Sequence, residues 1–384
     1  MSFLKKVAKK IIGLFPLRNV IVFESRPDYS DNTFMVFQEM VSRGIDKTIK
    51  MVWLCFDSDT VIKNQFQSKN IICLNVKKHK IRYAFYRYFA RVTICCNRFI
   101  GSDSNKQKSF YLMHGSPIKD TTAFYKCPDY IKWMITASNG MLEPSAKGMC
   151  FDSKKCVALG FPRNDIFHNK KVDLSQLFGS HSKYIAWLPT VKQYKNGFNV
   201  GNSDMVSFIS NPEKAKELHS LLSKLDIVLI IKTHFAQVDY LKTDTSLSNI
   251  IFINNSFLNM NGLDTYSFLT GVDALLTDYS SVYYDFLLCD KPVGFVWDDI
   301  ELFKKELGVV DGFDSYTRAG EKIYSLVELK DFIIRINDNV DVLKKERKEV
   351  CSFANFGNDG LNSKRVCDFI LNECGIAKKT RNKK

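Results

Sequence analysis

Residues 273–286 read DALLTDYSSVYYDF, and this stretch decides the fold. The apolar run from Ala274 to Thr277 predicts a buried strand, and the residues from Ser281 to Leu288 predict a helix. A short polar turn is all that separates the two. A strand that leads directly into a helix is the repeating unit of parallel α/β sheets.

Strands and helices alternate in the same way on both sides of this unit. The C-terminal half adds strands at Tyr184–Leu188, Ile227–Ile231, Ile250–Ile253 and Val293–Val296, and helices at Glu213–Lys224 and Asp264–Leu269. The N-terminal half has strands at Val20–Phe23, Ile49–Cys55, Val92–Cys96, Ser109–Met113, Met134–Ala137 and Lys155–Leu159, and helices at Asn32–Arg43 and 78–91. Helical patterns at 326–350 and 361–373 end the chain.

These two sets predict an α/β protein with two Rossmann-like domains facing a cleft. The polar stretch 169–183 reads as the linker between them. We expect an N-terminal domain over residues 1–168, a C-terminal domain over 184–350, and a C-terminal helix with a basic tail over 351–384.

Composition narrows the class of protein. Of the 384 residues, 45% are hydrophobic and 25% charged, which is typical of a folded domain and excludes a largely disordered chain. No run of about 18 apolar residues predicts a transmembrane helix. The 11 cysteines form no CxxC pair, which favours reduced thiols in a cytoplasmic protein.

The basic residues gather in three patches that hold no acid. Residues 1–20 contain five Lys and Arg, residues 76–98 contain seven, and residues 378–384 contain five. Because the whole chain has a formal net charge of +14, the remainder sums to −3. This asymmetry indicates an anionic surface or polymer as partner.

Two of these patches also carry apolar side chains. The first 15 residues place Phe3, Leu4 and Val7 near helical spacing opposite lysines, which predicts an amphipathic segment on anionic lipid or a docked surface helix. Residues 77–98 interleave bases with aromatics. That pattern favours a membrane interface or anionic acceptor, while a core helix and a groove for single-stranded nucleic acid stay open.

The turn after the strand 274–277 is a candidate phosphate seat. Thr277, Asp278, Ser280 and Ser281 place hydroxyl groups and backbone N–H groups at a helix start, although ordinary N-capping accounts for the same residues. Asp285, further along the same helix, is a candidate acceptor of hydrogen bonds from diol hydroxyls.

A second candidate follows the strand 109–113. His114 stands where that strand ends, and Gly115, Ser116 and Pro117 force a sharp turn. Ligands of α/β sheets bind at such carboxyl ends, and an imidazole there takes a proton from a hydroxyl near neutral pH. A local structural histidine is the alternative.

Three further strand ends carry candidate binding residues. Lys232 and His234 lie two residues apart, so they share one side of a strand and suit a phosphate or a diphosphate. Gly160, Arg163 and Asn164 form a turn whose arginine can grip a phosphate with two donors. Pro189, Thr190 and Lys192 place a hydroxyl and a cation after the first strand of the C-terminal half.

Several common sites are missing from the sequence. There is no GxGxxG, no GxxxxGK[ST] and no GxSxG, so nicotinamide, P-loop and serine-hydrolase chemistry have no support. Asp57-Ser58-Asp59 and Asp298-Asp299 are weak candidates for a metal site, and a polar turn explains the former equally well.

Taken together, these segments resemble the CDP-glycerol:poly(glycerophosphate) glycerophosphotransferase family of teichoic acid synthesis, which includes primases and polymerases. In chain order they match an H-G-[TS]-P-L-K element, a G-x-P-R-N-D turn, a P-T-x-R segment, a K-x-H-P segment and the signature D-x-L-I-T-D-Y-S-S-x-x-x-D-F. The matching residues are His114–Lys119, Gly160–Asp165, Pro189–Lys192, Lys232–Phe235 and Asp273–Phe286. Lys192 stands where the family has Arg, and Phe235 where it has Pro, departures that bear on the alditol and acceptor more than on the reaction class.

The resemblance implies a GT-B-like arrangement with the CDP-alditol on the C-terminal domain and the acceptor and membrane on the N-terminal one. It implies that an acceptor hydroxyl attacks the β-phosphorus of the donor and that CMP leaves. His114 is then the expected base, and Lys232, His234, Ser280 and Ser281 hold the diphosphate. We expect no cofactor and no metal, because phosphoryl transfer depends mainly on positioning and charge stabilisation.

The expected protein is therefore an enzyme, a CDP-glycerol glycerophosphotransferase acting on a lipid-linked acceptor of the teichoic acid or capsule type. Its expected partners are that acceptor and an anionic lipid surface, without nucleic acid, and its expected place is the cytoplasmic membrane face as a peripheral protein. Transfer of ribitol phosphate from CDP-ribitol stays open. A basic nucleic-acid-binding protein is the alternative from a different class.

Overall fold

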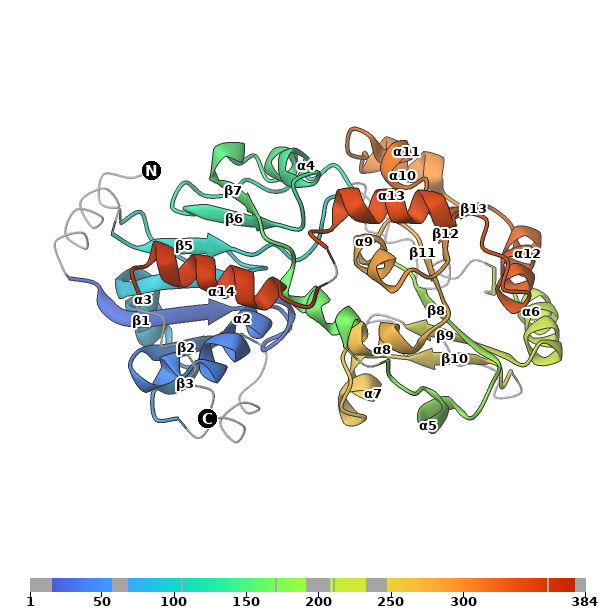
Figure 1. Ribbon diagram of the computed structural model, residues 1–384, viewed down its shortest axis with the longest axis horizontal. Coiled ribbons are helices and arrows are strands. Elements are labelled where there is room, and N and C mark those ends of the chain that lie inside the picture. The colour runs from blue at the N-terminus through green and yellow to red at the C-terminus, as the bar shows by residue number, and fades with distance from the viewer. Residues whose placement is uncertain are drawn as a thin grey trace. The chain divides into compact units, whose positions relative to one another are not determined.

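The computed structural model describes residues 16–56, 68–104, 106–169, 171–190, 208–209, 211–232, 247–357 and 359–376. The chain divides into two compact units (Figure 1). Unit 1 comprises Met1–Ser116, Thr122–Asp165 and Asp359–Lys384, and unit 2 comprises Pro117–Thr121 and Ile166–Asn358. Each unit contains one parallel sheet, so the prediction of two α/β domains is confirmed.

Unit 1 is built on a seven-stranded parallel sheet in the order β3-β2-β1-β4-β5-β6-β7. Its strands are β1 (Arg18–Glu24), β2 (Lys50–Cys55), β3 (Ile71–Asn75), β4 (Ala90–Cys95), β5 (Lys108–Tyr111), β6 (Trp133–Thr136) and β7 (Cys156–Ala158). The strand order reverses between β1 and β4, and in open α/β sheets ligands bind at the carboxyl ends beside such a switch point.

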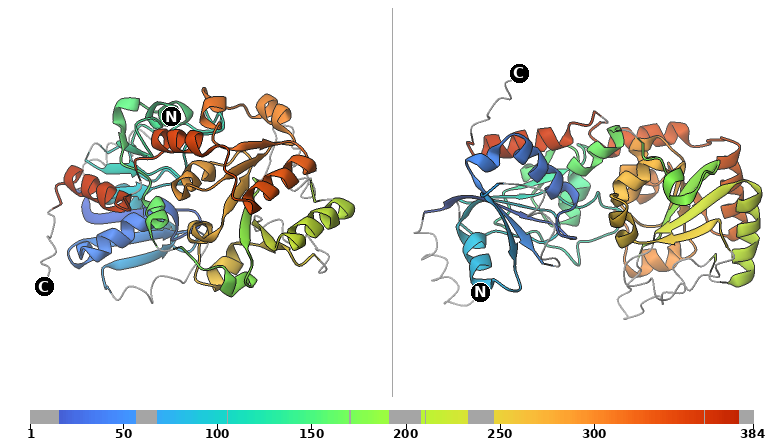
Figure 2. Two further views of the ribbon diagram at one scale, coloured as in Figure 1. Left: turned by 45° about the vertical axis from the view of Figure 1, so that its right-hand side comes forward. Right: turned by 90° about the horizontal axis from the view of Figure 1, so that it is seen from below.

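Helices cover both faces of this sheet (Figure 2). One face packs on α2 (Asp31–Ser42) and α14 (Asn362–Glu373), and the other packs on α3 (Lys80–Phe89) and α4 (Leu142–Gly148). Because both faces are covered, the strands are apolar throughout rather than alternating. Short 3-10 turns complete the unit at η1 (Ile45–Lys47), η2 (Ser153–Lys155) and the start of η3 (Pro162–His168).

The C-terminal helix α14 belongs to unit 1 although it follows unit 2 in the chain. Asp165 accepts hydrogen bonds from the N–H groups of Asn362 and Ser363, both at 2.8 Å, and so caps the start of the helix. Gly160 has a φ of +83°, and a Cβ there would lie 2.0 Å from Asn362 Oδ1. The glycine is therefore required by the close approach of α14.

Unit 2 is built on a six-stranded parallel sheet in the order β10-β9-β8-β11-β12-β13, and its order reverses between β8 and β11. Its strands are β8 (Lys183–Leu188), β9 (Ile227–Lys232), β10 (Ile250–Ile253), β11 (Ala274–Thr277), β12 (Val293–Val296) and β13 (Glu321–Ile323). One face packs on α6 (Pro212–Lys224) and α12 (Leu326–Asn337).

The other helices of unit 2 are shorter. They are α5 (Ser175–Phe178), α7 (Asn255–Met260), α8 (Thr265–Gly271), α9 (Val282–Phe286) with the 3-10 turn η5 (Leu287–Cys289), α10 (Ile300–Glu306), α11 (Phe313–Tyr316) and α13 (Lys344–Ala354). The segment Pro117–Thr121 also belongs to this unit, where Lys119 forms an antiparallel bridge with Val309.

Several local expectations were incomplete. The edge strands β3 and β13 were not predicted, and the helical pattern 326–350 is two helices, α12 and α13. The polar stretch 169–183 contains α5, and Leu174 and Phe178 within it are buried. None of the described helices is long and apolar enough to cross a bilayer.

Candidate functional site

The backbone around His114 is held in place by one buried side chain. Asn32, in the first turn of α2, donates from Nδ2 to the carbonyls of Leu112 at 3.2 Å and Met113 at 2.9 Å. Met113 has a φ of +50°, a left-handed conformation that costs energy for a residue other than glycine. Asn32 thus fixes a strained turn directly before His114.

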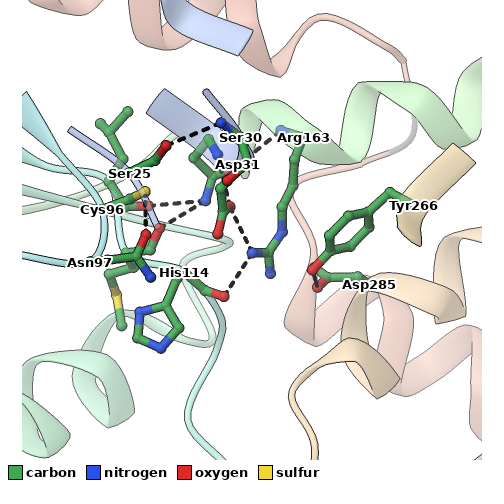
Figure 3. A network of polar contacts seen from close by, with 12 residues as sticks. Ser25, Ser30, Asp31, Cys96, Asn97, His114, Arg163, Tyr266 and Asp285 are labelled. Atoms are coloured by element: carbon green, nitrogen blue, oxygen red, sulfur yellow. Dashed lines mark hydrogen bonds and ion pairs between the residues drawn. The ribbon is translucent and has the colours of Figure 1, made fainter. Parts of the chain in front are cut away.

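Arg163 completes this support (Figure 3). Its Nη1 donates to Asp31 Oδ1 and to the carbonyl of His114, both at 2.7 Å, and its backbone N–H donates to Asn32 Oδ1 at 3.1 Å. The Arg163 side chain is 5% exposed. The guanidinium predicted to grip a phosphate is therefore engaged within unit 1, on the carboxylate of Asp31 and the backbone of His114.

The His114 side chain is exposed at the carboxyl end of β5, and in Figure 3 its ring extends away from Arg163. Protein surrounds its other sides, and this desolvation lowers the pKa of His114 below its ordinary value. The charge of the Asp31 carboxylate acts in the opposite direction, because it favours the protonated ring. The imidazole is thus neutral at pH 7 and able to accept a proton.

The remaining predicted residues of unit 1 lie at the same sheet edge. Gly115 is half-buried, and Ser116 is buried with no hydrogen-bond partner for its Oγ among the described residues. Asn164 is buried in η3 beside Arg163, and Gly160 precedes that turn. Gly160 and Arg163 have contacts inside unit 1 that account for their residue types.

In unit 2, the predicted residues gather at the switch point between β8 and β11. Asp278 accepts from Thr190 through the backbone N–H at 2.7 Å and through the hydroxyl Oγ1. Thr277 Oγ1 donates to the Leu188 carbonyl at 3.0 Å. These bonds join the loop that follows β8, which includes Pro189, to the residues at the end of β11. The buried side chains of Thr277 and Asp278 therefore fix the backbone at the switch point.

The helix that follows the predicted phosphate-binding turn is shorter than expected. The helix α9 covers five residues, Val282–Phe286, and continues only as a 3-10 turn. Ser280 and Ser281 are half-buried directly before it, and Ser280 Oγ lies 3.5 Å from the Val282 N–H. Two serine hydroxyls therefore stand at the edge of the switch point, while the helix dipole behind them is small.

Asp285 lies on α9 and is buried. Its Oδ2 accepts a hydrogen bond from the Tyr266 hydroxyl of α8 at 3.2 Å, as Figure 3 shows. The carboxylate that was predicted to accept from diol hydroxyls thus accepts from a phenol hydroxyl in this structure.

Lys232 ends β9, the strand next to β8. It is half-buried, and burial lowers the pKa of its amine below the usual lysine value. An anion beside the amine would oppose this shift, so the position suits a phosphate. Two other predicted residues, Lys192 and His234, lie outside the described residues.

Two residues that hold the backbone around His114 were not among the predicted site residues. Asp31 and Asn32 begin α2, where Asp31 pairs with Arg163 and Asn32 binds the Met113 carbonyl. The polar segment 25–32 directly follows the first central strand, and this placement at a sheet switch point was the available signal. Among the described residues, no group of three or more His, Cys, Asp or Glu could hold a metal ion.

Comparisons with known proteins identify the family of the chain. The family model for CDP-glycerol:poly(glycerophosphate) glycerophosphotransferase matches residues 10–372. The teichoic acid poly(glycerol phosphate) polymerase of Bacillus spizizenii is 23% identical over 329 residues, which are 78% of this chain and 79% of that protein. The teichoic acid glycerol-phosphate primase of Bacillus subtilis is 25% identical over 66% of this chain and 61% of its own length.

The fold is also similar to a solved structure. The wall teichoic acid polymerase TagF superposes with a TM-score of 0.73 at 18% identity, covering 97% of this chain and 93% of the other. This likeness supports the fold, and the family match covers most of the chain. The protein therefore belongs to the CDP-glycerol:poly(glycerophosphate) glycerophosphotransferase family and is a phosphotransferase.

Proposed function

We propose that the enzyme transfers glycerol phosphate from CDP-glycerol to a hydroxyl of a lipid-linked acceptor of the teichoic acid or capsule type. The acceptor oxygen forms a bond to the β-phosphorus, the bond from that phosphorus to the CMP oxygen breaks, and CMP leaves. The observation that carries the proposal is the exposed imidazole of His114 at the carboxyl end of β5 in unit 1, and the lowering of its pKa by desolvation is consistent with a neutral ring.

His114 acts as the general base in this reaction. It takes the proton of the acceptor hydroxyl as the new bond forms, which requires a neutral ring at working pH. Because desolvation lowers its pKa, the ring stays neutral through the physiological range. Arg163 and Asn32 hold the backbone from which the ring projects.

Unit 2 holds the donor. Lys232 neutralises the diphosphate, and the hydroxyls of Ser280 and Ser281 donate to its oxygens. Asp278 positions Thr190 at the same edge. One TagF structure was determined after a soak with CDPG, and the polymerase and primase relatives bear names that specify glycerol phosphate. We propose that these groups act without a resident metal ion, so turnover should survive EDTA.

The acceptor is presented at a membrane. Lys77 and Lys78 are exposed directly before α3, and Lys80 and Arg82 are exposed in its first turn. On the same helix Ile81 is 87% exposed and Phe85 is 41% exposed. Tyr86 is the buried residue of that helix. Cations beside exposed apolar side chains suit anionic lipid headgroups. The predicted amphipathic segment 1–15 lies outside the described residues and would add to this attachment.

The donor and the base are tested by measuring CMP release. The protein is incubated with CDP-glycerol or CDP-ribitol and a lipid-linked acceptor. We expect CMP from CDP-glycerol, none after His114→Ala, and nearly intact nucleotide binding in that variant. His181→Gln is the control, because His181 pairs with Asp226 before β8 begins, away from the carboxyl ends. Release of CMP only from CDP-ribitol would identify CDP-ribitol as the donor. No release of CMP from either nucleotide would refute the proposed reaction.

The membrane part has its own test. Sedimentation with liposomes containing anionic lipid should weaken when residues 1–15 are deleted, and also in Ile81→Ser with Phe85→Ser. Val327→Ser removes another exposed apolar side chain, on α12, and should leave sedimentation unchanged. Equal sedimentation of all variants would refute attachment through these two segments. Tight, salt-sensitive RNA or DNA binding that survives His114→Ala would favour the nucleic-acid alternative.

A further inference from the structure

The loop that follows β4 carries an arginine, Arg98, with which no carboxylate of the described residues forms an ion pair. Arg98 is half-buried, and its guanidinium lies over the face of the Phe56 ring, with Cζ 3.9 Å from the ring centroid. Stacking on an aromatic face leaves the N–H groups of the guanidinium plane able to donate. Their fork geometry matches the oxygens of a phosphate.

The backbone of this loop is fixed at the switch point of unit 1. Glu24 ends β1, where it pairs with Cys95 of β4, and it is fully buried. Its Oε2 accepts hydrogen bonds from the backbone N–H groups of Arg98 at 2.9 Å and Asn97 at 3.2 Å. Asn97 Oδ1 in turn accepts from the Arg26 N–H at 2.8 Å. The Arg98 side chain therefore projects from a backbone that is held to the end of β1.

The Asn97 side chain supplies a second donor in the same loop. Its Oδ1 accepts from the Arg26 N–H and lies 3.1 Å from the Cys96 thiol, so the orientation of the amide is set (Figure 3). Within the described part of the chain, its Nδ2 donates to no protein group. The loop thus presents a guanidinium and an amide nitrogen, both of which donate hydrogen bonds.

Strand register places these donors at the same sheet edge as His114. Cys95 of β4 pairs with Tyr111 of the neighbouring strand β5. Arg98 and His114 each follow that pair by three residues, so both stand just beyond the carboxyl ends of adjacent strands. Ligands of open α/β sheets bind at this edge, beside the switch point.

The neighbouring acidic side chains are already engaged by protein groups. Asp31 pairs with Arg163 at 2.7 Å, and Asp28 accepts from the backbone N–H of Phe56 at 3.0 Å. These carboxylates have donors of their own, so the Arg98 cation is left to attract an anion from solvent.

We propose that Arg98 and Asn97 bind a phosphate group of the acceptor, next to the hydroxyl that His114 deprotonates. The inference rests on the proposed function, which assigns the acceptor hydroxyl to His114. A phosphate bound by these donors holds the neighbouring hydroxyl near the imidazole. Arg98 and Asn97 then select an acceptor that already carries a polyol phosphate over a neutral polyol.

The experiment compares Arg98→Met, Arg98→Lys and Asn97→Asp with the wild-type protein. The probe is a soluble glycerol phosphate oligomer, and glycerol is the neutral acceptor for comparison. Release of CMP from CDP-glycerol gives kcat and the KM for each acceptor. Calorimetric titration measures binding of the oligomer without turnover.

Arg43→Met is the matched control, because it removes an arginine of unit 1 from the opposite edge of the sheet. Arg43 follows α2, before β2 begins, and pairs with Glu39 at 2.7 Å and Asp368 at 2.6 Å. We expect this variant to be less stable but to keep the wild-type KM for the oligomer.

Arg98→Met should raise the KM for the oligomer, and weaken its binding, by about 10- to 100-fold, the effect of losing hydrogen bonds to a charged group. The kcat and the KM for CDP-glycerol and for glycerol should stay constant, because the phosphate is bound equally before and during transfer. Arg98→Lys keeps the charge but loses the fork, so its KM should be intermediate. Asn97→Asp keeps an oxygen for the Arg26 N–H but adds a negative charge, so it should also raise the KM.

An oligomer KM in Arg98→Met equal to that of the wild type, or an equal rise of the KM for glycerol, would overturn the proposal. Sedimentation with phosphatidylglycerol liposomes tests the other source of phosphate. If Arg98→Met weakens sedimentation but leaves oligomer binding constant, Arg98 binds a lipid headgroup and the proposal is wrong. If the wild type releases no CMP, the proposed function fails, while the calorimetric comparison still decides whether Arg98 binds the oligomer.

Discussion

Replacing Arg163 by methionine should lower both the stability of unit 1 and the turnover number. Arg163 and Asp31 form an ion pair at 2.7 Å with side chains 5% and 14% exposed. Removing the cation leaves a carboxylate largely buried and unpaired, and such a loss typically costs about 3–5 kcal/mol. At the lower figure the folded-to-unfolded ratio falls roughly 150-fold.

The same substitution removes the donor to the His114 carbonyl. We therefore expect kcat to fall while the KM for CDP-glycerol stays constant, because the guanidinium binds protein groups rather than the donor. The sequence alone had favoured a phosphate contact for Arg163. That role would instead raise the KM and leave stability intact.

The assay is a double-mutant cycle. Urea unfolding of the wild type, Arg163→Met, Asp31→Asn and the double variant is followed by circular dichroism, with a separate transition fitted for each unit. Because each single variant leaves one partner without its pair, the double variant should lose less than the sum of both. Additivity within about 0.5 kcal/mol, or a raised KM at unchanged stability, would refute the reasoning.

Three further outcomes follow from other parts of the molecule. In urea unfolding, Gly160→Ala should destabilise unit 1 more than Gly262→Ala destabilises unit 2. Both glycines have a positive φ, but only a Cβ at position 160 would clash with a neighbour, Asn362. Equal losses of stability would contradict this. The KM of the wild type for CDP-glycerol should rise with pH as the half-buried Lys232 amine loses its charge. In Lys232→Arg the KM should stay constant, because arginine remains charged. An equal rise of the KM in both proteins would show that Lys232 does not bind the donor. The folded-state pKa of Glu24 is raised from 4.5 to about 7, so ionisation of its carboxyl group destabilises the wild type as the pH rises through that window. Between pH 4.5 and 8, the free energy of unfolding of Glu24→Gln in urea should therefore rise by about 3 kcal/mol relative to that of the wild type. No relative gain would contradict the shift.

The sequence was sufficient to predict most central elements of both sheets. Buried parallel strands are continuous apolar runs, and such runs are local, so stretches like Ile227–Ile231 and Ala274–Thr277 are visible without knowing their neighbours. The edge strand β13 was missed because two of its three residues, EKI, are charged. The edge strand β3, IICLN, is an apolar run that is visible in the sequence but was overlooked. The polar residues after each central strand were recognisable as site candidates for the same local reason.

The tertiary structure decided what those candidates do. Arg163 meets Asp31 across 132 positions of the chain, and Thr190 meets Asp278 across 88. Such pairs depend on strand order and register, which no local pattern specifies. Whether an arginine at a strand end faces a substrate or a carboxylate is set by what folds against it, and for Arg163 and Glu24 the partners lie in segments distant in sequence.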